Sequence, residues 1–115
     1  MLNDTINLSP RLKLTDPELL DVGVILRKIQ LTPHKNTLPP FQATVFEVAP
    51  GCCSPIDRHA VKECWIILKG HGELHYSDAK YQASSQDIFY FEPHHTHQIF
   101  NNNDELLVIC SIYWQ

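Results

Sequence analysis

Residues 51–70 read GCCSPIDRHAVKECWIILKG, and side chains that can bind a metal recur in this stretch at fixed intervals. Five residues separate the first glycine from Asp57, one separates Asp57 from His59, three separate His59 from Glu63, and six separate Glu63 from the last glycine. A further histidine, His97, follows later in the chain. Because carboxylates and imidazoles are the ligands of hard and borderline divalent metals, these four residues predict a metal site.

This spacing resembles the first motif of the cupin family. That motif has a glycine, two histidines, a glutamate and a second glycine at these intervals. Four of its positions are matched here by Gly51, His59, Glu63 and Gly70. Asp57 stands where the family usually has its first histidine. A match at this many offsets is a specific signal.

A second cupin-like motif follows after residues 71–86. It is similar to the family pattern at Asp87, Pro93, His97 and Asn101, with one residue fewer than usual between Pro93 and His97. The resemblance implies an all-β fold, the cupin double-stranded β-helix or jelly-roll barrel.

The pattern of apolar residues also predicts strands. Short β-branched and aromatic runs alternate with turn residues from Phe41 onward: FQATVFEV, ECWIILK, ELHYS, DIFYFE, HQIFN and ELLVICSIYW. Residues 22–31 are a further expected strand. Residues 15–20 carry a capping-box pattern that predicts at most one helical turn. We therefore expect a single domain with an N-terminal arm and edge strands over 1–40 and the barrel over 41–115.

A straight strand through the first motif cannot bring its ligands together. Alternation places Asp57, His59 and Glu63 on one face, together with Trp65 and Ile67. A strand rises about 3.3 Å per residue, so Glu63 would lie about 13 Å from His59. We therefore expect the chain to bend at residues 60–62.

The donor set constrains the metal only in part. His59, Glu63 and His97 suit non-haem Fe(II), and Mn, Ni, Co and Zn accept the same donors. Asp57 is either a fourth ligand or an acceptor that orients His59. A cupin that has lost its metal is the alternative, although it would leave a buried His and Glu without compensation.

Three residues are candidates for catalysis: Glu63, His95 and Tyr76. An imidazole titrates near neutrality, so His95 is a candidate proton-transfer group, with an exposed loop histidine as the alternative. Tyr76 could combine a wall contact with a hydroxyl near the ligand. Arg58 falls between two inward positions and is expected to face outward. With no paired Arg or Lys expected near the motifs, a phosphorylated substrate is disfavoured.

Composition excludes several classes of protein. The chain has 115 residues and a formal net charge of -4 without a basic cluster, which disfavours nucleic acid as a partner. No apolar run approaches the roughly 20 residues of a membrane span, and the polar N-terminal stretch predicts a cytoplasmic protein. The four cysteines are expected to be free thiols.

The resemblance implies a small metal-binding enzyme that acts on a small organic molecule. Dioxygenases and redox-neutral isomerases, lyases and cyclases are all compatible with the donor set. There are two alternatives: a non-catalytic module that binds a sugar or metabolite, and an assembly subunit with a vestigial site. An exposed edge on the strand at 22–31 further predicts a homodimer.

Overall fold

The computed structural model describes residues 10–31 and 39–115, and within these ranges the protein is all-β. The described strands are β1 (Lys13–Leu14), β2 (Glu18–Asp21), β3 (Val24–Gln30), β4 (Gln42–Val48), β5 (Lys62–Lys69), β6 (His71–Tyr76), β7 (Ala79–Ser84), β8 (Ile88–Phe91), β9 (His97–Phe100) and β10 (Leu107–Trp114). The described ranges contain no helix long and apolar enough to cross a membrane.

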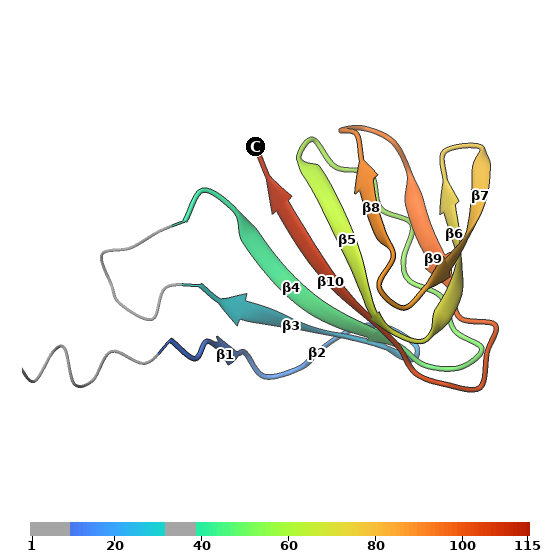
Figure 1. The fold of residues 1–115 in the computed structure, drawn as a ribbon, viewed down its shortest axis with the longest axis horizontal. Coiled ribbons are helices and arrows are strands. Elements are labelled where there is room, and N and C mark those ends of the chain that lie inside the picture. Colours follow the sequence, from blue (N-terminus) through green and yellow to red (C-terminus); the bar gives the residue numbers. More distant parts are fainter. Residues whose placement is uncertain (1–9, 32–38) are drawn as a thin grey trace, which may run out of the picture.

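The strands form two sheets in a jelly-roll arrangement. A seven-stranded sheet has the order β1-β3-β4-β10-β5-β8, with β2 paired to β3, and a three-stranded sheet has the order β7-β6-β9. The named pairings are antiparallel. Figure 1 shows the smaller sheet standing beside β5 and β8, while β3 and β4 extend away toward the N-terminal side. The predicted fold class is confirmed.

Alternating burial explains why these segments are strands. In β5, Glu63, Trp65 and Ile67 are buried while the residues between them are more exposed. β10 follows the same period of two, as expected for strands with one face on the core. The buried core joins both sheets and consists of Val24, Phe46, Val48, Trp65, Ile67, Leu74, Ala83, Phe91, Ile99, Leu107 and Ile109.

Asn101, the last residue of the second motif, supports the fold and does not face the candidate site. Its side chain is fully buried, and its amide donates to the carbonyl oxygens of Val48 and Glu105. Its Oδ1 accepts a hydrogen bond from the backbone N–H of Asn103. A buried side-chain amide satisfied in this way fixes the chain between β9 and β10.

Two expectations about elements need correction. The capping-box interpretation of residues 15–20 is wrong, because Glu18–Asp21 is strand β2 and pairs with β3. The hydroxyl of Thr15 accepts a hydrogen bond from Lys28 N, so it is used to join strands. Strand β7 was not anticipated from its sequence, AKYQAS, which has mostly exposed polar side chains.

The strand predicted over 22–31 is confirmed as β3, but its expected free edge is not. β3 pairs with β4 on one side and with β1 and β2 on the other. The edge therefore gives no reason for a homodimer.

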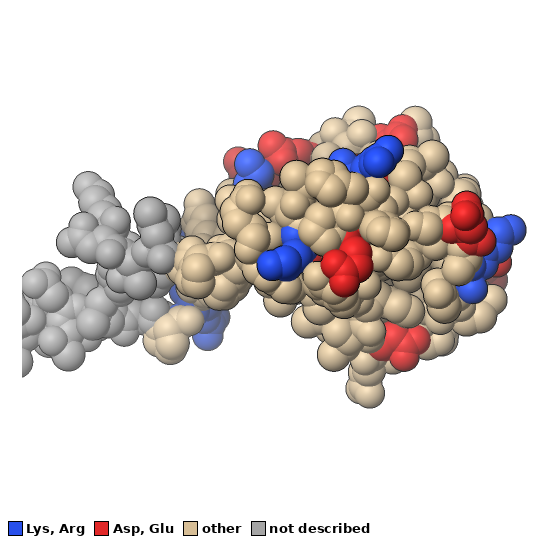
Figure 2. Space-filling model, turned by 90° about the horizontal axis from the view of Figure 1, so that it is seen from above, with Lys and Arg blue, Asp and Glu red and all other residues tan. Residues whose placement is uncertain are grey.

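Figure 2 shows charged side chains in small separate groups, with broad uncharged surface between them.

Candidate metal centre

The two motifs meet through the backbone. Asp57 N donates to His97 O at 3.1 Å, and His97 N donates to Asp57 O at 3.0 Å. This isolated antiparallel bridge holds the loop before β5 against the start of β9. His94 N also donates to His59 O at 2.6 Å. Residues distant in sequence are thus placed side by side by main-chain hydrogen bonds.

The bend expected in the first motif is confirmed. After the bridge at Asp57 the chain leaves strand geometry, and β5 begins only at Lys62. His59 therefore approaches Glu63 across a bend, with 3.7 Å between His59 Nε2 and Glu63 Oε1. A straight strand would separate the same two residues by about 13 Å along its axis.

Glu63 is oriented by two donors from the core. Trp65 Nε1 donates to its Oε2 at 2.8 Å, and Ser111 Oγ donates to the same oxygen at 2.6 Å. Both hydrogen bonds are buried. Because Oε2 is occupied, the other oxygen, Oε1, faces the histidines.

Oε1 of Glu63 and Nε2 of His97 are the least satisfied atoms of the site. They lie 3.1 Å apart, both are buried, and neither has a hydrogen-bond partner among the described residues. Unpaired buried polar atoms are costly, and either a proton on His97, which makes this contact an ion pair, or a cation bound by both atoms offsets that cost. Two donors bonded to one ion at about 2.1 Å are roughly 3 Å apart, which matches this spacing.

Asp57 and His59 complete the arrangement on the cavity side. One ligand atom each from Asp57, His59 and His97 lies within 4.8 Å of the others. His59 Nε2 is 3.8 Å from Asp57 Oδ2. Glu63 lies outside that three-residue set but contacts both histidines as described above. The four side chains predicted as ligands are therefore brought together, and the site is compatible with a metal ion.

The two carboxylates are shifted in opposite directions. Burial raises the pKa of Glu63, but the His97 imidazole and the Ser111 and Trp65 donors outweigh it and hold that pKa below its usual value. For Asp57, burial dominates and raises the pKa, although His59 and His97 partly offset it. The site thus favours the ionised form of Glu63, whereas the ionised form of Asp57 would be stabilised by a cation nearby.

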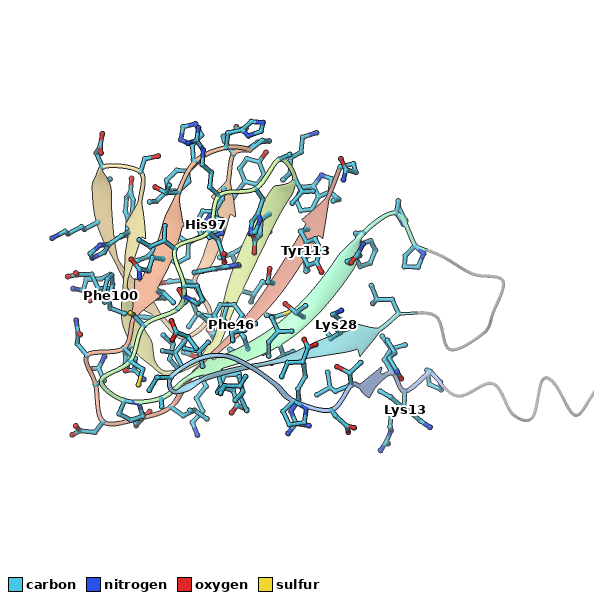
Figure 3. The ribbon with its side chains drawn as sticks, turned by 180° about the vertical axis from the view of Figure 1, so that it is seen from behind. Lys13, Lys28, Phe46, His97, Phe100 and Tyr113 are labelled. Atoms are coloured by element: carbon cyan, nitrogen blue, oxygen red, sulfur yellow. The ribbon has the colours of Figure 1, made fainter. Side chains whose placement is uncertain are left out.

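A cavity of about 690 Å³ opens beside these residues. Its wall includes apolar side chains from β2, β3, β4 and β5, among them Leu20, Leu26, Phe46 and Trp65. Asp57, His59 and Glu63 are also on the wall. In Figure 3, His97 lies to one side of Phe46 and Tyr113, which belong to strands β4 and β10 of the large sheet. This volume suits a small organic molecule.

Two predicted catalytic residues lie elsewhere. His95 is exposed, and its Nδ1 is hydrogen-bonded to Ser77 Oγ at 2.9 Å. The Tyr76 ring stacks on His95 at 5.5 Å, and its hydroxyl accepts a hydrogen bond from Glu92 N. Neither is among the residues that line the cavity, and their catalytic roles stay predictions.

Three site residues were not anticipated. Ser111 carries no motif signal, and its role follows only from β10 lying next to β5. Lys28 and Arg58 are both exposed and both line the cavity, although no paired Arg or Lys was expected to face inward near the motifs.

Comparison with known proteins finds both sequence relatives and solved structures similar to this chain. It is 33% identical over 67 residues to "Auxin-binding protein T92" of Nicotiana tabacum, covering 50% of this chain but only 36% of that protein. A crystal structure of a Cupin 2 conserved barrel domain protein from Salinispora arenicola CNS-205 is 29% identical with a TM-score of 0.73, covering 84% of this chain and 80% of that one.

A predicted oxalate decarboxylase from Thermotoga maritima has the same fold, with a TM-score of 0.71 at 16% identity, covering 89% of this chain and 93% of that one. The sequence profile of the family described as the cupin domain matches residues 44–113, which is more than half of the chain. This protein is therefore a member of the cupin family.

Proposed function

We propose that this cupin binds one divalent metal through Asp57, His59, Glu63 and His97 and acts on a small organic molecule held in the adjoining cavity. The observation that carries the proposal is the pair of buried atoms, Glu63 Oε1 and His97 Nε2, that face each other without hydrogen-bond partners. A cation satisfies both at once, whereas a hydrogen bond between them would leave Asp57 and His59 unexplained.

The protein's own side chains would divide the work. Glu63 presents one oxygen because Trp65 and Ser111 hold the other, which is how supporting hydrogen bonds orient a ligand. His97 is packed against Phe91, with ring centroids 4.5 Å apart, so its imidazole has little freedom to turn. Asp57 and His59 are more exposed and border the cavity, next to where a substrate would enter.

When bound, a divalent metal supplies a Lewis acid for an oxygen of the substrate and, if it is iron, a centre for dioxygen chemistry. The chain's contribution to either reaction is to hold the substrate and exclude water. The apolar wall formed by Leu26, Phe46 and Trp65 would remove water from the carbon skeleton of the ligand. Both a dioxygenase and a redox-neutral isomerase, lyase or cyclase remain within the proposal.

Metal content tests the site directly. We expect protein purified without added metal, then loaded and desalted, to retain about one ion per chain by elemental analysis. His97→Ala and Glu63→Gln should each lose most of it, because each removes a buried ligand. His71→Ala is the matched control, since His71 is exposed and hydrogen-bonded to Ser84 away from the cavity. Equal metal in all four proteins would contradict the proposal.

A binding protein without catalysis is the second candidate. It is favoured by the similarity to a protein named for binding auxin, although the aligned segment spans little more than a third of that relative. Oxygen uptake and product analysis on candidate metabolites separate the two. Metal-dependent turnover selects the enzyme, and saturable binding without turnover selects the binding protein.

A further inference from the structure

We propose that the cavity ligand is a small organic carboxylate, whose charge is balanced by Lys28 and Arg58 on the cavity wall. This inference rests on the proposed function and specifies its ligand. It begins from the two cations on a mainly apolar wall that the metal site does not use.

Neither cation has a partner within the described part of the chain. Lys28 takes part in hydrogen bonds to Thr15 only through its backbone N and O. No ion pair or hydrogen bond is formed by the side chain of Lys28 or Arg58 there. Charged side chains that border an apolar cavity without a counter-ion are suited to hold an anionic ligand.

Strand register places Lys28 on the same face of the large sheet as Ser111, two strands away from it. Lys28 lies opposite Thr44, which lies opposite Ser111, the donor to Glu63. With neighbouring strands about 4.8 Å apart, the backbones of Lys28 and Ser111 are separated by about 10 Å. Figure 3 shows Lys28 and His97 on opposite sides of Phe46 and Tyr113. A ligand that spans this gap is a small molecule with two polar ends.

The charges on the wall favour a monoanion. Asp57, Glu63 and Glu18 are the acidic residues that line the cavity. Asp57 and Glu63 together balance a divalent ion, which leaves Glu18 against the two cations and a net charge of about +1. The apolar residues Leu20, Leu26, Phe46, Val61 and Trp65 suit a hydrocarbon or aromatic body between the polar ends.

Matched acids and amides test the charge requirement. We would titrate phenylacetate against phenylacetamide, and 3-phenylpropionate against its amide, into metal-loaded protein by calorimetry. Within each pair the shape is almost constant and only the charge changes. We expect the acid to bind more tightly than the amide, and we expect added salt to reduce the difference.

Variants identify the residues responsible. Lys28→Gln and Arg58→Gln should each weaken acid binding by about three- to tenfold, as expected for a charged contact near solvent, with little effect on the amide. Lys69→Gln is the matched control, because Lys69 is an exposed lysine outside the cavity wall. Glu18→Gln should strengthen or preserve acid binding, since it removes a like charge.

The inference is overturned if no acid binds more tightly than its amide, or if Lys28→Gln and Arg58→Gln bind the acids as the wild type does. Metal analysis of the same samples separates this failure from that of the proposed function. Lys28 and Arg58 are not ligands, so their variants should contain as much metal as the wild type. Loss of acid preference with metal retained disproves only the carboxylate proposal, whereas a wild type that holds no metal disproves the function on which it rests.

Discussion

Glu63 illustrates how a single residue acquires its role from its neighbours. One carboxylate oxygen accepts two buried hydrogen bonds, and the other is buried without any. A carboxylate with both oxygens satisfied would have little reason to bind a cation. A carboxylate with neither satisfied would be costly to bury. The division between the two oxygens therefore sets both the orientation and the ionisation of Glu63.

Asp57 is expected to destabilise the metal-free protein at neutral pH. Its pKa in the folded state is raised from 3.8, so folding favours its protonated form. The stability that this protonation provides is present below about pH 3.8 and is lost as the pH rises through the folded pKa. Asp57→Asn should therefore increase the free energy of unfolding at pH 7 in the presence of a chelator. The gain should not exceed about 0.5 kcal/mol, because water screens a half-exposed carboxylate.

Urea unfolding at two pH values checks the sign. The difference between Asp57→Asn and the wild type should vanish near pH 3.5 and should reverse at pH 7 when metal is present, because the ion compensates the carboxylate. A chelated Asp57→Asn protein that unfolds more easily than the wild type at pH 7 would show that Asp57 is stabilised by other means.

At the scale of elements, two glycines of the first motif have different tasks. Gly70 joins β5 to β6 with a φ of +88°, and a Cβ there would lie 2.6 Å from the carbonyl oxygen of Leu106. Gly51 has a φ of +78° in the turn after β4, but a Cβ there would meet no atom within 4 Å. Both need a left-handed backbone, and only Gly70 also needs the space.

Alanine substitutions separate these two requirements. Gly51→Ala should lower the free energy of unfolding by about 1 kcal/mol, the cost of a left-handed conformation for a non-glycine residue. Gly70→Ala should cost about 3 kcal/mol or more, because the backbone of Leu106 must also move. Denaturant titrations of both variants against the wild type measure the difference. Similar losses would mean that the close approach at Gly70 is relieved cheaply.

At the scale of the whole molecule, the outer face of the large sheet lacks a cover among the described residues. We define this face by the side chains that alternate with the buried ones on its strands: Ile25, Val45, Cys64, Ile66, Leu68, Ile88, Tyr90, Val108, Cys110, Ile112 and Trp114. Leu68, Ile88 and Tyr90 are 50%, 66% and 45% exposed. A contiguous apolar face of this kind marks an interaction surface.

We propose a second copy of the chain as the partner of this face. Among the described residues, Arg27, Glu47, Lys62 and Lys69 are charged and pair with members of this face, but the row across its middle, Val45, Cys110, Ile66 and Ile88, carries no charge for a partner to complement. An uncharged face can pack against itself about a two-fold axis. The homodimer thus stays a prediction, on different grounds from the edge strand first considered.

Light scattering with variants tests the homodimer. Wild-type protein at micromolar concentration should have the mass of two chains, and Ile88→Lys should have the mass of one while remaining folded. Val22→Lys is the control, because Val22 is 81% exposed and lies outside this face. Burial raises the pKa of Cys64 and of Cys110, so both thiols of the wild-type protein should be alkylated slowly at neutral pH. Both should be alkylated faster in the Ile88→Lys protein than in the wild type. A monomeric wild type would disprove the prediction.

Local sequence patterns were sufficient for much of the fold and for the types of ligand. Alternation of apolar residues is a property of a strand with one buried face, so β3, β5 and β10 could be recognised from their own residues. The four donors could be recognised because metals select few side-chain types. The polar strand β7 and the segment at Glu18–Asp21 could not be recognised as strands from their own residues, since their structure depends on the neighbours with which they pair.

Which atoms face one another was decided only by the tertiary structure. Ser111 is 48 residues from Glu63, and their hydrogen bond exists because β10 lies beside β5 in a particular register. Lys28 reaches the cavity because β3 joins the same sheet through β4. Periodicity acts over a few residues, whereas strand order and register arise from packing of the whole chain. The sequence alone therefore determined the donor residues and the architecture, and folding determined which residues those donors contact.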